Sequence, residues 1–220
     1  LNMKKLSILF NKDLLISKKE YSSLFSGIAF GLTSIIFYNL TIDLFILDVK
    51  TVLPGLLWIT FLFCGILVTN KSFEQEIDNG IIYALKILNI PLTLIAISKT
   101  VTNFLFILVI EFVLIIAALV FFNIQIVDFR MILPIIIISL GMISLLTCLS
   151  PLSYKNQSGT FLTYIIVVPL LIPLLLAATR ITFVLIGIID VEQHWVLLGT
   201  LFSFWQTIMS IILFQFIIDE

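Results

Sequence analysis

Residues 71–100 read KSFEQEIDNGIIYALKILNIPLTLIAISKT and combine charged with apolar side chains. The charged positions are Lys71, Glu74, Glu76, Asp78, Lys86 and Lys99. Long apolar runs flank this stretch on both sides, and most of the remaining chain is rich in Ile, Leu and Phe. Charged side chains are costly in hydrocarbon, so the stretch predicts a loop that joins two membrane-spanning helices outside the bilayer.

The composition supports a membrane location for the whole chain. Of its 220 residues, 61% are hydrophobic and only 11% are charged, and the mean hydropathy is +1.24. These values lie far from those of a soluble domain of this size. We therefore expect an all-α integral membrane protein that forms one transmembrane domain over residues 1–220.

Six apolar runs are long enough to cross the hydrocarbon core, which takes about 20 residues in a helix. They lie near Ser22–Ile42, Val52–Asn70, Val101–Phe122, Met131–Pro151, Thr160–Thr179 and Trp195–Ile218. The run Ile181–Ile189 is too short to cross alone. It is interpreted as a continuation of the fifth span or as a partly buried outer segment, and a seventh span stays open at this point.

Lysine and arginine positions predict which side of the membrane each loop occupies. With six spans and the N-terminus inside, nine basic residues fall in the cytoplasm: Lys4, Lys5, Lys12, Lys18, Lys19, Lys71, Lys86, Lys99 and Lys155. The other three, Lys50, Arg130 and Arg180, fall outside. Both termini and the 71–100 loop are therefore expected in the cytoplasm.

The segment Met3–Lys19 precedes the first span and lacks the features of a cleaved signal peptide. Its apolar residues Leu6, Leu9, Phe10 and Leu14 recur at helical spacing, with lysines on the other faces. This pattern predicts an amphipathic helix at the membrane interface. The alternative is a basic flank that only fixes the orientation of the chain.

The sequence contains no pattern that would carry catalysis or bind a metal. It has no GxxxxGK[ST] phosphate loop and no HExxH, and it contains one histidine. Cys64 and Cys148 both fall inside predicted spans without a CxxC pattern, so they are interpreted as packing residues. We assign no catalytic residue, metal ligand or firmly bound cofactor. The chain is not expected to be an enzyme, and the partners expected are lipid and other proteins, with no nucleic acid.

Glu111 is the acidic residue near the middle of a predicted span. A charge at this depth is a common sign of a proton or cation path. The alternative is a carboxyl group that faces the bundle interior and hydrogen-bonds a neighbouring helix. Because a single carboxylate without a partner makes a poor proton relay, an ion-coupled secondary transporter using Glu111 is kept as an alternative function.

Three other features have an ordinary structural interpretation beside a functional one. Arg180 is expected to anchor the outer end of the fifth span by reaching the headgroups. His194 beside Trp195 suggests a haem ligand, but an interfacial histidine in an aromatic belt explains it as well. Gly27 and Gly31 form a GxxxG pattern, which predicts a close helix contact inside the subunit or between subunits.

The 71–100 loop has an internal pattern of its own. Asp78-Asn79-Gly80 is a turn signal. After it, Ile81, Ala84, Leu85 and Leu88 share one helical face up to the interruption at Pro91. This predicts a short helix at the membrane surface. It is either a solvated connector or a docking surface on which a partner ATPase acts.

Four stretches of the chain resemble the CcmB family, the membrane permeases of the ABC-type haem exporter in cytochrome c maturation. They are PGLLW at residues 54–58, the segment from Phe73 to Leu85 followed by Pro91 and Lys99, SLGM at 139–142, and VPLLIPL at 168–174. With the number of spans, the resemblance covers nearly the whole chain. Asn79 and Tyr83 depart from the acidic residues expected in the loop, and Glu111 is not a recognised family feature.

The resemblance implies a six-span subunit that pairs with a second copy and binds the ATPase CcmA. It also implies CcmC, CcmD and the haem chaperone CcmE as partners, with haem as the transported or chaperone-bound species. The expected location is the bacterial inner membrane, or the inner membrane of mitochondria.

The residues assigned to ATPase docking on this basis are Phe73, Glu74, Glu76, Asp78, Gly80 and Leu85. Pro54, Gly55, Pro169 and Pro173 are assigned as structural motif residues. Besides ion-coupled transport, a membrane scaffold without any coupling function is the remaining alternative. Partner-dependent ATP hydrolysis would distinguish the permease from both.

Overall fold

A computed structural model describes residues 7–13, 22–42, 48–78, 80–88, 90–155 and 159–219. Their regular secondary structure is entirely helical, without strands. The long helices are α2 (Ser22–Thr41), α3 (Val49–Asp78), α5 (Leu92–Phe122), α6 (Ile132–Lys155), α7 (Gly159–Leu185) and α8 (Gln193–Asp219). Two short helices, α4 (Ile81–Ile87) and the 3₁₀ helix η1 (Phe129–Met131), lie in the connections, and residues 7–13 form a further helix.

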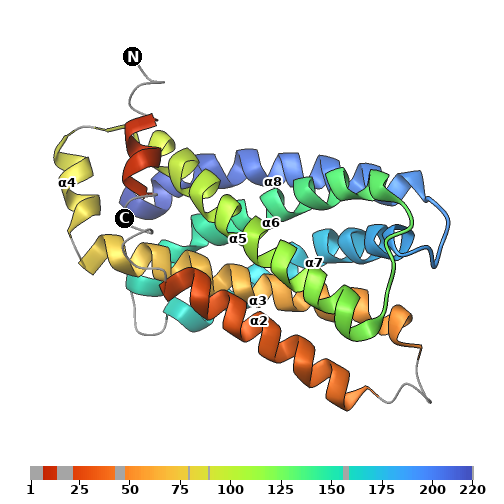
Figure 1. The fold of residues 1–220 in the computed structure, drawn as a ribbon. Helices are drawn as coiled ribbons and strands as arrows, with labels where there is room; N and C mark the ends of the chain where they lie inside the picture. The colour runs from red at the N-terminus through yellow and green to blue at the C-terminus, as the bar shows by residue number, and fades with distance from the viewer. Residues whose placement is uncertain are drawn as a thin grey trace.

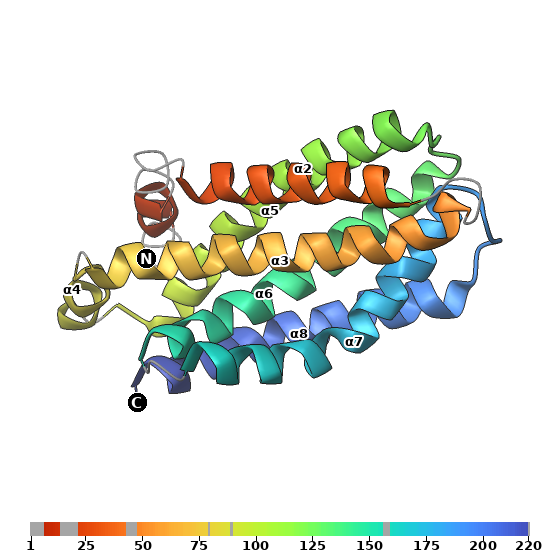
Figure 2. The same cartoon turned by 90° about the horizontal axis from the view of Figure 1, so that it is seen from below.

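All six predicted spans are confirmed as helices long and apolar enough to cross a membrane. Among the described residues there is no seventh. The long helices pack into one bundle, in which α5 runs obliquely to α8 (Figure 1) and to α3 (Figure 2). The helix of residues 7–13, α4 and the C-terminal end of α8 lie at the same end of the bundle, which we call the α4 end.

Two helices form the centre of the bundle. α6 packs along α8, α7, α3 and α5, and α3 packs against α2, α5, α6 and α7 (Figure 2). The residues of α3 and α6 are mostly buried inside the protein, whereas most residues in the apolar stretches of α2, α5 and α8 keep some surface facing outward. Such outward apolar surface is expected where lipid replaces water as the solvent.

The main difference from the predicted spans is length at the α4 end. α3 has 30 residues and α5 has 31, so each is about 45 Å long against a hydrocarbon core of about 30 Å. The charged segment that follows Asn70 continues α3, because Lys, Glu and Gln are good helix formers. Both helices are therefore longer than the hydrocarbon core is thick, and the predicted loop consists largely of two helical arms.

Prolines do not end the helices in which they occur. The sequence prediction ends the fourth span at Pro151, but α6 continues through it to Lys155. Pro54 lies inside α3, and Pro169 and Pro173 lie one turn apart inside α7. Each proline removes one backbone hydrogen bond, a loss that neighbouring helices compensate more readily inside a membrane bundle than in water.

Both interpretations of the segment Ile181–Ile189 hold in part, because residues 181–185 continue the fifth span and residues 186–189 form a partly buried turn. α7 runs to Leu185, and the chain then turns at Gly187, which has a positive φ of 74°. The backbone N–H of Val127, in the connection after α5, donates to the Leu185 carbonyl at 2.8 Å. The α5–α6 and α7–α8 connections therefore pack on each other at the end opposite α4.

Gly27 and Gly31 form a contact inside the subunit. A Cβ placed on Gly27 would lie 2.7 Å from Cδ1 of Ile110, and one on Gly31 would overlap the Leu114 side chain. Ile110 and Leu114 both belong to α5, so the GxxxG pattern is the seam between α2 and α5. This answers the question that the sequence left open about this motif.

Candidate functional site

The connection between α3 and α5 is the most elaborate one in the described chain. α3 ends at Asp78, Gly80 turns the chain with a φ of 65°, and α4 follows over Ile81–Ile87. Pro91 then takes the position before α5, where its missing N–H is not needed. The turn and the short helix predicted from the sequence are both present.

The six residues assigned to docking divide into buried and accessible ones. Phe73 and Glu76 are each 1% exposed, and Leu85 is also buried. Glu74 is exposed, and Gly80 forms the turn. Asp78 is the last residue of α3, and its side chain lies outside what the structure describes. In this structure three of the six therefore position the loop from within and do not reach the surface.

The accessible surface of the loop is more apolar than the sequence pattern predicted. Leu85 is buried and Ile81 packs against the same cluster, as expected for the inner face of α4. Ala84 is exposed, and Ile87 and Leu88 are 81% and 67% exposed. These last two residues are neighbours at the C-terminal end of α4, and we call this exposed apolar pair the apolar step.

Four charged residues gather at the base of this loop, and we call Lys12, Asp13, Glu76 and Lys99 the base cluster. Lys12 Nζ binds Glu76 Oε1 and lies 2.8 Å from Asp13 Oδ1. Lys99 Nζ lies 3.2 Å from Glu76 Oε2. Two cations and two carboxylates thus neutralise one another where three helices meet. Of these four side chains only Lys12 keeps appreciable contact with solvent.

Neighbouring polar groups complete the base cluster. Lys99 Nζ also donates to the Ser72 carbonyl and to Ser72 Oγ, both at 2.9 Å. The same ammonium group lies 4.6 Å from the centre of the Phe73 ring, within the range of a cation–π contact. Ser98 Oγ donates to Asp13 Oδ2. A buried ammonium group needs such partners, since it loses the hydration that it would have in water.

The pKa values of the base cluster reflect competition between burial and opposite charge. Burial favours neutral Glu76, but the adjacent Lys99 and Lys12 outweigh it and hold the Glu76 pKa below its ordinary value. Burial likewise disfavours charged Lys12, but Glu76 and Asp13 outweigh it and raise the Lys12 pKa. For Asp13, burial dominates over the attraction of Lys99 and raises the pKa.

Sequence reasoning did not identify the base cluster. The sequence pattern puts Lys12 on the polar face of an interfacial helix, and it does not single out Asp13 or Ser98. Glu76 lies 64 residues from Lys12 in the chain, and no local pattern links residues so far apart. The only signal was an excess of charge just outside two apolar runs.

Glu111 lies on α5 in the bundle interior, as the ordinary interpretation of this residue expected. Its two carboxylate oxygens lie 2.8 and 3.0 Å from Ser139 Oγ on α6, which can donate to either. Ser139 Oγ is also 3.1 Å from the Ile135 carbonyl. The carboxyl group is therefore a polar link between α5 and the central helix α6.

Replacing Glu111 with glutamine should leave cytochrome c maturation within about twofold of the unmodified chain. The glutamine side-chain oxygen can still accept from Ser139, and the carboxyl group has no acidic or basic hydrogen-bond partner among the described residues that would form a relay. Maturation is measured as haem-stained c-type cytochrome at equal membrane level of the chain. Complete loss at normal level would support ion-coupled transport instead.

Residues at the opposite end form surface contacts. His194 is exposed, with Nε2 3.6 Å from a Glu192 carboxylate oxygen. The Arg180 guanidinium carbon lies 5.9 Å from the centre of the Trp195 ring. Among the described residues no group of three His, Cys, Asp or Glu could hold a metal ion. Cys64 and Cys148 are buried and free.

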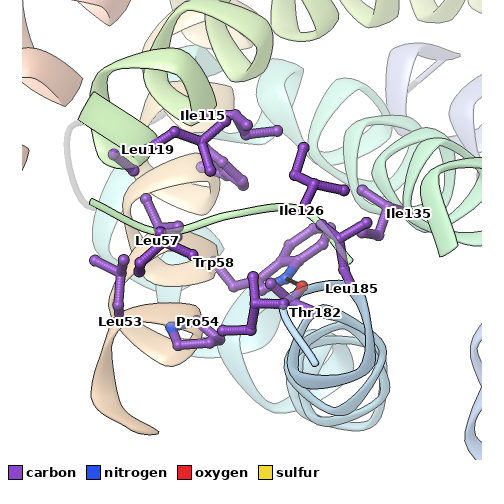
Figure 3. A pocket seen from close by; sticks show the side chains of 14 residues that line it. Leu53, Pro54, Leu57, Trp58, Ile115, Leu119, Ile126, Ile135, Thr182 and Leu185 are labelled. Atoms are coloured by element: carbon purple, nitrogen blue, oxygen red, sulfur yellow. Dashed lines mark hydrogen bonds between the residues drawn. The ribbon is translucent and has the colours of Figure 1, made fainter. Parts of the chain in front are cut away.

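An apolar cavity of about 50 Å³ lies near the opposite end, between α3, α5 and α7. Figure 3 shows Trp58 crossing it, with the indole N–H donating to Thr182 Oγ1 at 2.8 Å. Pro54, Leu57, Ile115 and Leu185 complete its walls. An engineered cavity of about 150 Å³ is needed to hold benzene, so this one is far too small for a haem.

The fold defines a multi-pass helical membrane protein with a short helix, α4, in the connection between two long spans. The family model of the CcmB protein matches residues 4–218, nearly the whole chain. The chain belongs to the CcmB family. It is accordingly a haem-export permease subunit of cytochrome c maturation and a member of the Ccm ABC complex. No curated protein and no solved structure matches it significantly.

Proposed function

We propose that this chain couples a partner ATPase to haem delivery, and that the ATPase docks on the connection between α3 and α5. The observation that carries the proposal is the apolar step of Ile87 and Leu88, held at the end of two long helices beyond the span length. Exposed apolar side chains in water favour a protein contact. Among the described residues Glu111 has no titratable hydrogen-bond partner with which it could pass a proton, so its contacts do not favour ion-coupled transport.

The loop is suited to transmit force as well as to bind. Its arms are α3 and α5, which continue into the bundle without interruption and contact α6 and each other. Phe73, Leu85 and Ile95 bury the inner side of the loop in one apolar cluster. A push on α4 therefore acts on both spans together. The docking assignment of Glu74, Asp78 and Gly80 stays within this proposal.

The ATPase is proposed to be CcmA-like, with CcmC-, CcmD- and CcmE-like proteins as further partners and a second copy of this chain in the complex. In this proposal ATP hydrolysis releases haem-loaded chaperone from the complex.

The α4 end is proposed to face the cytoplasm of a bacterial cell, or the matrix if the chain is mitochondrial. In a chain without other cysteines, a cysteine at position 78 should resist a membrane-impermeant thiol reagent added from outside, while one at position 48 should react. The reason is the excess of basic residues at the α4 end, including Lys12, Lys71 and Lys99. Reaction at 78 and protection at 48 would reverse the topology.

Reconstitution tests the proposed function. The chain is placed in proteoliposomes with its CcmA-like ATPase, its CcmC- and CcmD-like partners and haem-loaded chaperone, and chaperone release is measured with and without ATP. ATP-dependent release that requires this chain is expected. Release that proceeds equally without the chain, or that follows an imposed proton gradient without ATP, would contradict the proposal.

A further inference from the structure

The base cluster joins three segments that are far apart in the sequence. Lys12 links the helix of residues 7–13 to Glu76 on α3, and Glu76 is in turn paired with Lys99 on α5. Asp13 accepts from Ser98 on α5, which closes the ring. No segment can shift relative to the other two without breaking at least one of these contacts.

The location of the ring relates it directly to the loop. Glu76 is two residues before the end of α3, and Lys99 is in the second turn of α5. The Glu76–Lys99 ion pair therefore ties the two arms together on either side of α4. Below it, Leu9, Phe73 and Leu85 share the apolar cluster that also includes Phe214 of α8. α4 is thus fixed to the same base through Leu85.

Stability alone does not account for four charges at this place. A buried ion pair gains little over apolar side chains of similar volume, because desolvation offsets the attraction between the charges. Removing one partner, in contrast, leaves an uncompensated buried charge. Paired charges do favour one relative position of the helices that carry them, because an ion pair forms only where its donor and acceptor atoms are within reach of each other.

We propose that the base cluster makes the helix of residues 7–13, α3 and α5 one rigid unit, through which movement of the docked ATPase reaches the membrane spans. Glu76 and Lys99 are positioning residues in this proposal and do not contact the ATPase. The inference rests on the proposed function, because it concerns how force leaves the docking loop. It assigns the buried residues of the loop to transmission and the exposed ones to binding.

The test uses a variant that keeps the cluster neutral. Glu76→Gln with Lys99→Met removes one carboxylate and one cation, and it leaves Lys12 paired with Asp13. We expect the double variant to insert and to bind the CcmA-like ATPase at the unmodified level, while cytochrome maturation falls at least tenfold. Lys99→Arg keeps the charge and should retain maturation. Lys50→Met with Asp190→Asn, which also removes one cation and one carboxylate but at exposed positions of the opposite end, is the matched control and should change neither property.

Two results would overturn the inference. One is normal maturation by the double variant, which would make the base cluster a packing feature. The other is parallel loss of ATPase binding and maturation, which would assign Glu76 and Lys99 to docking. Failure of the unmodified chain to co-purify the ATPase would instead reject the proposed function itself.

A second variant covers the case in which the first fails to insert. Lys12→Met with Asp13→Asn leaves Glu76 and Lys99 paired and lies outside the spans. It should free the helix of residues 7–13, measured as at least tenfold faster amide hydrogen exchange there, and lower maturation at least threefold with the ATPase still bound. Faster exchange with unchanged maturation would overturn the inference.

Discussion

Replacing Gly141 with valine is expected to remove most of the folded protein from the membrane. A Cβ on Gly141 would lie 2.7 Å from the Cα of Ser203, a backbone atom of α8 that cannot turn aside. The α6–α8 contact is the most extensive helix pair in the described chain. Overpacking of this kind costs about 3 kcal/mol or more, a large fraction of the stability of a domain. The measurement is membrane level together with thermal unfolding in detergent.

Two other glycines serve as controls for this prediction. Gly55→Ala meets no atom within 4 Å and should leave the membrane level unchanged. Gly31→Ala meets the side chain of Leu114, which can adopt another rotamer, so an intermediate loss is expected. A normal level of the Gly141→Val chain, with an unchanged unfolding temperature, would contradict the close α6–α8 packing.

Replacing Ile87 and Leu88 together with aspartate should lower the affinity for the CcmA-like ATPase by at least tenfold. Each side chain is more than half exposed, and burying an apolar side chain of this size in an interface contributes about 1.5 to 3 kcal/mol. Since about 1.4 kcal/mol corresponds to a tenfold change, loss of both contacts exceeds that limit. Maturation should fall in parallel.

Co-purification of the ATPase with this variant, at equal membrane level, provides the measurement. Val127→Asp with Val191→Asp is the matched control, because it places the same two charges at exposed apolar positions at the opposite end of the bundle. It should retain full co-purification. An Ile87/Leu88 variant that retains the ATPase as well as the control does would show that α4 is a solvated connector.

Hydropathy alone predicted the six spans because each is a continuous apolar run of sufficient length. The point at which α3 ends before α4 was harder to predict, since Lys71–Asp78 is polar and yet continues α3 as helix. Polarity predicted that this segment leaves the bilayer, but helix propensity decides that it stays helical. Pro151 does not end α6 for a different reason: proline has the lowest helix propensity, but it stops a helix in water more effectively than within a packed membrane bundle.

The sequence predicted which segment forms the candidate site, but it did not predict which of its side chains are buried or what they contact. The turn at Gly80 and the buried side of α4 at Leu85 follow from local pattern. The burial of Glu76 does not, because it depends on Lys12 and Lys99, and the chain must fold before those charges meet. A charged residue in a loop is normally taken as solvated. Here long-range pairing reverses that expectation.

The most direct measurement is site-specific photo-crosslinking from position 88 in the assembled complex. A photoreactive side chain replaces Leu88, and a second chain carries it at Val127, an exposed position at the opposite end. The account predicts an ATPase adduct from position 88 and none from position 127. Both photoreactive chains must be present in the membrane at the level of the unmodified chain. An ATPase that crosslinks from elsewhere on the chain but never from position 88 would contradict docking at α4.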